Sequence, residues 1–218
     1  MVTLYGFAYS NYFNIVKHAL LLKKIPFQEH KIYPGSPELL PISPVGKVPA
    51  ITTPCGTHIS ETTAILEYLE DNFPANPLMP SDAAERARVR QIIKVIELYI
   101  ELSTRRLLPT ALAGIEPNPE LLTEVRATAE KGVVALNALT NCSPYLTGST
   151  LTMADIYCRY AMAIPQLVGP KVLQWNIIEA INGLPELMHV LAESEISQKI
   201  DADMKANQAE FMAKVRGG

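Results

Sequence analysis

The sequence is poor in cysteine, and the cysteines that it has are odd in number and far apart. Cys55, Cys142 and Cys158 form neither a C-x-x-C redox motif nor the spacing of a zinc site. This usage suits a reducing compartment. Each cysteine is interpreted as a small buried hydrophobe or a loop residue, rather than as a catalytic thiol.

Long apolar runs, basic blocks and metal-type histidine spacings are also missing. No run approaches the roughly 18 apolar residues of a membrane-spanning helix, and M-V-T-L-Y-G-F lacks the layout of a secretory signal. The net charge is −3 and no basic segment stands out, which argues against nucleic-acid binding. The histidines have neither metal spacing nor acid and nucleophile partners: His18, His30, His58 and His189. We expect a cytoplasmic protein that binds no membrane, nucleic acid or metal.

The chain has enough apolar residues for well-packed domains, since 48% of its 218 residues are hydrophobic. The elements expected in its first third are a strand at 2–5, a helix after it, a strand at 27–32, a hairpin at 48–53 and 57–60, and a helix at 61–72. This order is β-α-β followed by β-β-α. It is the element order of an α/β thioredoxin-like domain.

The character of the chain changes after Phe73. The segment F-P-A-N-P-L-M-P-S-D is rich in proline and suits a short, stiff connection between domains. Asp82 with Glu85, and later Thr152 with Asp155, form capping boxes that open helices, and most of the remaining chain has helical periodicity. We therefore predict a thioredoxin-like domain, a linker and an all-α helical domain, at 1–76, 77–84 and 85–218.

The segment V-G-K-V-P-A-I places a proline at the start of the predicted hairpin. Proline is ordinary at the first position of a strand, and only about 5–6% of X-Pro bonds are cis in folded proteins. In this β-α-β-β-β-α context, however, a cis bond would turn the backbone of Val48 outwards. Its N–H and C=O could then pair with a small extended peptide.

The segment H-I-S-E-T-T-A-I-L-E-Y-L has two interpretations that remain open. In the first, Ser60 is a helix N-cap and Glu61 gains from the helix dipole, by about 0.3–1 kcal/mol. In the second, free N–H groups of the first turn and the Thr62 hydroxyl bind a carboxylate, while Glu61 holds an ammonium group. A ligand with both groups on one carbon is an amino acid.

Taken together, G-K-V-P, S-E-T-T-A-I-L-E-Y-L and T-M-A-D resemble the glutathione S-transferase superfamily over essentially the whole chain, in a cytosolic, bacterial-like form. The resemblance implies glutathione as cosubstrate, a helical domain that shapes the second-substrate pocket, and a homodimer. It implies that Val48 and a cis Pro49 hold the cysteinyl part of glutathione by backbone bonds. Lys47 would lie near the glycyl end, and Glu61 and Thr62 would grip the γ-glutamyl end.

The activating residue of this superfamily lies in the first strand-to-helix turn, here G-F-A-Y-S-N-Y-F. The following I-V-K-H-A-L resembles the V-R-x-x-L pattern of serine- and cysteine-type members, and counting back from it places Ser10 at the activating position. Asn11 and Tyr9 are the reserve candidates, and Tyr5 is interpreted as structural. The plain alternative for Ser10 is a helix N-cap.

The resemblance implies a detoxifying transferase that stabilises the glutathione thiolate for attack on a small hydrophobic electrophile. Candidate residues of the second-substrate pocket are Tyr9, Tyr12, Tyr99, Leu102 and Arg105. Two alternatives stay open: a non-catalytic scaffold or regulatory protein with the same fold, and a glutathione-dependent isomerase. A thiol–disulfide oxidoreductase is disfavoured because the first turn has no cysteine.

Overall fold

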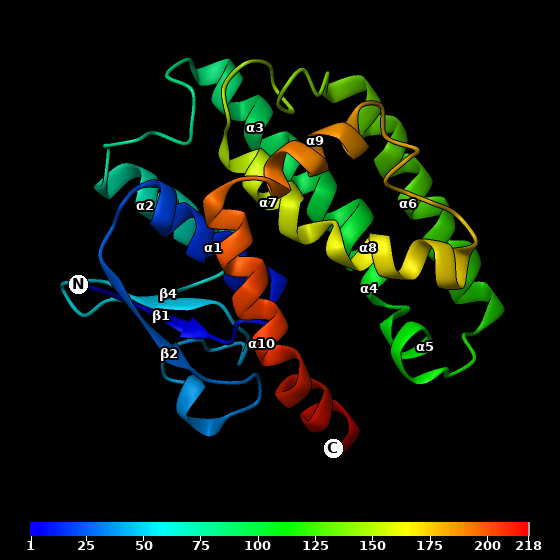
Figure 1. Cartoon of the computed structure of the whole chain (residues 1–218), viewed down its shortest axis with the longest axis horizontal. Helices are drawn as coiled ribbons and strands as arrows, with labels where there is room; N and C mark the ends of the chain where they lie inside the picture. Colours follow the sequence, from blue (N-terminus) through cyan, green and yellow to red (C-terminus); the bar gives the residue numbers. More distant parts are fainter. Residues whose placement is uncertain (218) are drawn as a thin grey trace. The chain divides into compact units, whose positions relative to one another are not determined.

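A computed structural model describes residues 1–217, and their contacts divide the chain into two compact units (Figure 1). The first unit is Met1–Leu78 together with the segment that starts at Glu193, and the second is Met79–Ala192. The predicted linker spans the boundary between Leu78 and Met79. The C-terminal helix α10, Glu195–Gly217, is counted with the first unit, although the sequence prediction assigned it to the helical domain. The predicted domain limits remain a prediction.

The first unit is built on a four-stranded sheet of order β2-β1-β3-β4. β1 pairs with β2 in parallel, and β3 pairs with β1 and β4 in antiparallel fashion. The strands and the two helices that follow them are β1 Val2–Gly6, α1 Asn11–Leu22, β2 Phe27–Lys31, β3 Ala50–Thr52, β4 His58–Ser60 and α2 Thr62–Asn72, with a short 3-10 helix η1 at Pro37–Leu39. The predicted thioredoxin-like fold is confirmed.

One face of this sheet carries the core of the first unit. Period-two alternation directs Val2 and Leu4 of β1 to that face, where they pack with the apolar stripes of α1 and α2. Gly6 ends β1 at a point of close approach, because a Cβ there would lie 2.4 Å from Cδ2 of Phe13. Only glycine fits at this position, so the chain leaves the strand directly under α1.

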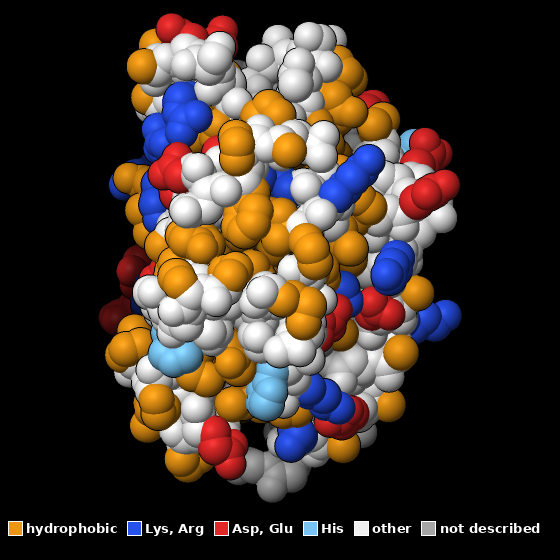
Figure 2. Space-filling model, turned by 90° about the vertical axis from the view of Figure 1, so that its left-hand side faces the viewer, with side chains coloured by type: hydrophobic (Ala, Val, Ile, Leu, Met, Phe, Trp, Pro, Cys, Tyr) orange, Lys and Arg blue, Asp and Glu red, His pale blue; other side chains and the backbone are white. Residues whose placement is uncertain are grey.

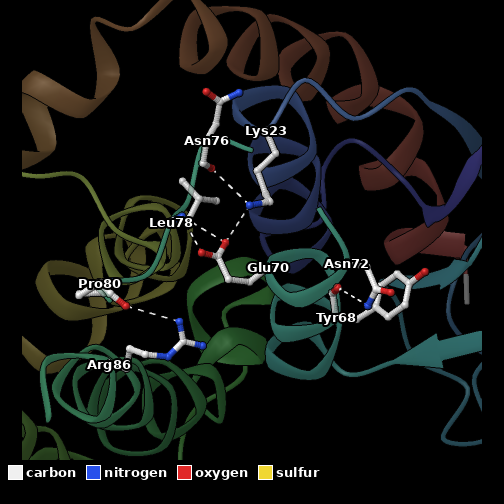
Figure 3. Close-up of polar contacts among 8 residues, drawn as sticks. All are labelled: Lys23, Tyr68, Glu70, Asn72, Asn76, Leu78, Pro80 and Arg86. Atoms are coloured by element: carbon white, nitrogen blue, oxygen red, sulfur yellow. Dashed lines mark hydrogen bonds and ion pairs between the residues drawn. The ribbon is translucent and has the colours of Figure 1, made fainter. Parts of the chain in front are cut away.

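A buried ion pair joins the ends of α1 and α2 to the connection that leaves the first unit (Figure 3). The Lys23 ammonium lies 2.8 Å from Oε2 of Glu70 and donates to the Asn76 carbonyl at 3.3 Å. The Leu78 N–H donates to both Glu70 oxygens, at 3.0 and 3.1 Å. Because the buried carboxylate accepts three hydrogen bonds from Lys23 and Leu78, the chain is fixed to the first unit up to Leu78.

The second unit is all-helical, as predicted. Its helices are α3 Ala83–Val95, the π-helix η2 Ile96–Glu101, α4 Leu102–Arg105, α5 Leu108–Ala113, α6 Pro119–Leu139, α7 Met153–Ala161, α8 Ala163–Val168, the π-helix η3 Gly169–Leu173 and α9 Leu184–Ala192. The helical periodicity after Asp82 does not mark the divisions between α3, η2, α4 and α5 that the structure has. Pro109 explains the last break, because proline lacks the N–H that continues a helix.

Side-chain caps start two of these helices where the sequence predicted them. Asp82 accepts from the N–H groups of Ala84 and Glu85, at 2.9 and 3.0 Å. Thr152 and Asp155 form the reciprocal capping box of α7. The Asp155 carboxylate also accepts from the Leu146 N–H at 2.7 Å, so the box holds the preceding loop as well as the helix.

Charged side chains of both signs occur on the surface (Figure 2), as the small net charge of the sequence indicates. On the face drawn in Figure 2, Lys and Arg side chains are scattered and alternate with Asp and Glu, and no continuous basic patch covers this face. Among residues 1–217, none of the helices combines the length and the apolar character that crossing a membrane requires.

Candidate active site

The turn between β1 and α1 presents Ser10 as the N-cap of the helix. Its backbone is extended, at φ −82° and ψ 118°, and its Oγ accepts from the Phe13 N–H at 3.3 Å. The Ser10 N–H donates to the Phe7 carbonyl at 3.0 Å and closes the turn. A hydroxyl has one donor and two acceptor positions, so the cap occupies a lone pair and leaves the O–H proton for another partner. The cap and the predicted chemical role are therefore compatible.

The residues next to Ser10 differ in their contacts with α10. Asn11 is the first residue of α1 and is half-buried, as is Tyr12 after it. The Tyr9 ring stacks on Phe211 of α10 with centroids 4.8 Å apart. The Tyr9 hydroxyl accepts from the Gln208 side chain at 3.4 Å, so α10 contacts both the ring and the hydroxyl of Tyr9.

Tyr5 points away from this turn. It lies within β1, and its hydroxyl accepts from Oγ1 of Thr52 at 3.1 Å, which in turn lies 2.9 Å from Nδ1 of His58. Its ring also contacts His30, the residue beside it on β2, with centroids 5.2 Å apart. These contacts cross the face of the sheet opposite to the core, and they match the structural role expected of Tyr5.

The peptide bond between Val48 and Pro49 is cis, as the resemblance implies. Pro49 is buried, Val48 is half-buried and Lys47 is exposed directly before β3. Within residues 1–217, the backbone N–H and C=O of Val48 make no hydrogen bond to another group of the protein. The edge of an extended ligand can therefore pair with them.

The start of α2 differs from the expectation that Ser60 is its N-cap. Ser60 is the last residue of β4, and Glu61 takes the N-cap position with φ 71° and ψ 120°. No side chain caps this helix end, so N–H groups of its first turn stay available to a carboxylate. The Glu61 side chain is exposed and Thr62 is buried at the first helical position. A positive φ is rare for a residue with a Cβ, and such strain is typical of functional sites.

The strand register brings these segments to one end of the sheet. Tyr5 of β1 pairs with Ala50 of β3, and Ala50 pairs with Ser60 of β4. Because neighbouring strands run antiparallel here, the residues after β1, those before β3 and those after β4 leave the sheet at the same end. The first turn, the cis peptide and the start of α2 thus form one site from three distant parts of the first unit.

The remaining predicted residues, Tyr99, Leu102 and Arg105, belong to the second unit. Tyr99 and Leu102 are exposed on η2 and α4. The Arg105 guanidinium donates to the fully buried Glu101 carboxylate, at 2.9 Å from its Nε. Part of the positive charge of Arg105 is therefore compensated by the last residue of η2, one turn earlier. Their role in a pocket remains a prediction.

Sequence reasoning missed the contribution of α10 to this site. The sequence prediction included this tail in the helical domain, and no local pattern marks its contacts with the first unit. The Lys17 ammonium of α1 lies 2.7 Å from Glu29 and 2.8 Å from Asp203 of α10. Burial disfavours the charge, but the hydrogen bonds to Asp203 and Glu29 outweigh it, and the pKa of Lys17 is raised. This ion-pair group fixes α10 against α1 and β2.

The cysteines Cys55 and Cys158 differ in exposure and in the pKa of their thiols. Cys55 is exposed in the β3–β4 turn, where hydrogen bonds with Thr53 and Thr57 lower the pKa of its thiol. Cys158 is fully buried in the second unit, and burial raises its pKa. Among the described residues, no three His, Cys, Asp or Glu side chains are grouped so that they could hold a metal ion.

Comparisons with known proteins agree on one family. The family model described as "Glutathione S-transferase, N-terminal domain" matches residues 4–77. A glutathione S-transferase of Pseudomonas putida is 36% identical over 219 aligned positions, which cover 100% of this chain and 99% of that protein.

Two further comparisons bear on function and fold. A maleylpyruvate isomerase of Ralstonia is 30% identical over 185 positions, or 80% of this chain and 84% of that protein. The crystal structure of glutathione transferase Omega 3C from Trametes versicolor superposes with a TM-score of 0.75 at 24% identity, over 91% of this chain and 88% of that one. At that identity the structural likeness supports the fold alone.

Proposed function

Because the chain belongs to the glutathione S-transferase family, we propose that it binds glutathione and stabilises its thiolate for attack on a small hydrophobic electrophile. The observation that carries this proposal is the register that gathers the first turn, the cis peptide and the start of α2 at one end of the sheet. Each of these segments offers a different part of a glutathione-binding surface.

The backbone and charges of this surface suit the three parts of glutathione. The free N–H and C=O of Val48 pair with the cysteinyl backbone, and Pro49 fixes their direction. Lys47 is exposed beside them and attracts the glycyl carboxylate. At the other side, Glu61 binds the γ-glutamyl ammonium, while the uncapped first turn of α2, with Thr62, binds its carboxylate. These assignments place the cysteinyl thiol towards Ser10.

One hydroxyl is sufficient to hold that thiol as a thiolate near neutral pH. Lowering a thiol pKa by about two units takes about 2.7 kcal/mol. A hydrogen bond to a charged group contributes about 1.5–3 kcal/mol, and a helix N-terminus about 0.3–1. Ser10 donates its O–H to the sulfur and remains neither base nor nucleophile, and Asn11 can add a second donor. The nucleophile is the thiolate of glutathione itself.

The electrophile binds next to the thiolate in an apolar pocket. We propose Tyr9 and Tyr12 of the first unit as lining residues, and the proposal that Tyr99, Leu102 and Arg105 contact the substrate rests on the family resemblance alone. Exposed aromatic and aliphatic side chains suit a small hydrophobic substrate. We further propose that the protein acts as a cytoplasmic homodimer, which light scattering of the purified chain would test.

The identity to a maleylpyruvate isomerase supports a second candidate, glutathione-dependent isomerisation. Both activities need the same thiolate, which adds to the substrate in each case. In an isomerase, the thiolate leaves again after rotation about the substrate bond and glutathione is recovered. Consumption of glutathione therefore separates the two: a transferase consumes one thiol per product, and an isomerase consumes none.

The test of the proposal combines binding, turnover and thiol titration. The wild-type chain should bind immobilised glutathione and turn over a generic aryl halide. Ser10→Ala should raise the pKa of bound glutathione, followed by thiolate absorbance against pH, by about one to two units. Tyr9→Phe and Asn11→Ala are the matched variants, with smaller expected shifts. Failure of the wild type to bind would favour the non-catalytic scaffold, and an unmoved titration in Ser10→Ala would remove Ser10 from the activating role.

A further inference from the structure

The peptide plane between Ala8 and Tyr9 is held on both sides by asparagine side chains. Nδ2 of Asn14, on α1, donates to the Ala8 carbonyl at 2.9 Å. On the other side, the Tyr9 N–H donates to Oδ1 of Asn207, on α10, at 3.1 Å. This peptide plane lies one residue before the Tyr9–Ser10 peptide, so fixing it limits the directions in which the chain can enter the N-cap.

The two asparagines are themselves fixed. Asn14 is 1% exposed within α1. Nδ2 of Asn207 lies 3.3 Å from both the Tyr33 hydroxyl and Oε2 of Glu210, and the Tyr33 hydroxyl donates to Oε1 of Glu210 at 2.9 Å. These donors and acceptors leave only one consistent orientation for the Asn207 amide, with its oxygen towards Tyr9.

We propose that Asn14 and Asn207 are positioning residues that clamp the Ala8–Tyr9 peptide and thereby aim the Ser10 hydroxyl at the glutathione sulfur. The inference rests on the proposed function. A donor stabilises a thiolate only when its O–H points at the sulfur, and small errors in direction weaken a hydrogen bond steeply. Ser10 has no side chain beyond its Oγ to correct such an error, so the backbone before it must supply the direction.

Helix α10 therefore takes part in thiol activation through the backbone of the turn. Its other contacts hold the helix in place: Asp203 with Lys17, Glu210 with Lys31 and Phe211 with Tyr9. Asn207, in contrast, bonds the backbone of the turn through its side chain. Variants of Asp203 and Asn207 can therefore separate the attachment of α10 from the hydrogen bond to the turn.

The experiment compares Asn207→Leu with Asp203→Asn in the full chain. Asp203→Asn weakens the attachment of α10 to Lys17 and leaves the Tyr9 N–H bonded. We expect Asn207→Leu to raise the pKa of bound glutathione by about one unit, with less than about a twofold change in its dissociation constant. Asp203→Asn should leave that pKa within about 0.3 of wild type. Asn207→Ala, a smaller substitution, should reproduce the shift if the leucine variant does not fold.

Equal shifts in the Asn207 and Asp203 variants, or no shift in either Asn207 variant, would overturn the proposal. Hydrogen exchange of the Tyr9 amide gives a second measurement that needs no glutathione. It should accelerate at least about tenfold in the Asn207 variants and stay unchanged in Asp203→Asn. If the wild type fails to bind glutathione, the proposed function fails. The exchange rates of the Tyr9 amide then test only whether Asn207 holds the turn. Acceleration confined to the Asn207 variants supports this contact, and unchanged exchange overturns it.

Discussion

At the scale of single residues, Glu61 combines an unfavourable backbone with an exposed side chain that makes no cap. A non-glycine residue in such a sparsely populated conformation costs about 1–3 kcal/mol, and the surrounding structure must hold it there. The positive φ of Glu61 allows the chain to turn from β4 into α2 and leaves the Glu61 carboxylate beside the free N–H groups of the helix. Stability is thus given up at the position where the ammonium group of glutathione is proposed to bind.

Replacement of Glu61 should separate these two effects. Glu61→Gly should raise the free energy of unfolding by about 1 kcal/mol, because relief of strain exceeds the extra entropy of glycine in the unfolded chain. The same variant should bind glutathione at least about tenfold more weakly, because a charge-assisted bond is lost. Urea unfolding and calorimetric titration measure the two quantities. Glu61→Gln retains the strain and serves as control, and a Glu61→Gly variant that is less stable than Glu61→Gln would contradict the argument.

Single residues also show how far the sequence could predict the site. Ser10 and Glu61 lie at ends of elements that local periodicity predicts, and the resemblance supplies the cis bond before Pro49. Asn207 is 198 positions from the amide that it accepts from, and no spacing rule connects them. Ser60 as N-cap was one of two open interpretations, because serine favours that position, but Glu61 with a positive φ precedes the helix instead.

At the scale of elements, α10 is attached to the first unit through a cation rather than through an apolar stripe alone. The Lys17 side chain is 4% exposed and lies between Glu29 of β2 and Asp203 of α10. An ammonium group so deep in the protein is tolerated because two carboxylates and their hydrogen bonds compensate its lost hydration. The charge of Lys17 therefore contributes to the attachment of the helix, beside its contacts with Lys31 and Tyr9.

This dependence predicts a loss of stability in alkaline solution. The folded pKa of Lys17 is raised above its unfolded value, so the stability from its charge is complete below about pH 10.4 and is lost as the pH rises through the folded pKa. Lys17→Met should lack this pH-dependent part of the free energy of unfolding, because it has no ammonium group at this position. The other lysines and the tyrosines titrate alike in both proteins, so their contribution cancels in the comparison. Urea unfolding of both between pH 9 and pH 12 gives the difference. If the free energies of unfolding of the two proteins change in parallel with pH, the charge of Lys17 does not stabilise the folded protein.

Element boundaries were predictable where a side chain makes them. Asp82 and Thr152 begin α3 and α7 as the capping patterns indicate, because the cap is a contact within a few residues. The π-helix η2 was not predicted. It packs against Gly132 of α6, where a Cβ would lie 2.5 Å from Cδ1 of Ile100, and such a contact between distant helices leaves no periodic signal.

At the scale of the whole molecule, binding of glutathione should be measurable as stability. A ligand that binds only the folded chain, at one hundred times its dissociation constant, stabilises it by about 2.7 kcal/mol. Ser10→Ala should keep most of this stabilisation, because the hydroxyl acts on the thiol rather than on the rest of the peptide. Glu61→Gln should lose a large part of it.

Thermal unfolding with and without glutathione measures this effect, and S-methylglutathione is the matched control ligand. Its sulfur cannot ionise, so wild type and Ser10→Ala should respond to it alike. A larger response of wild type to S-methylglutathione than to glutathione would contradict the role of the thiolate.

The arrangement of α10 also has a consequence for how the protein is made. The turn that carries Ser10 is synthesised early, and the amide oxygen that holds it follows 198 residues later. At about 5–20 residues per second, the ribosome needs about 10–40 s to cover that distance. During this interval Phe7 and Tyr9 lack the ring of Phe211, which stacks on both in the complete chain. The first unit therefore cannot be completed until the ribosome has synthesised the second unit.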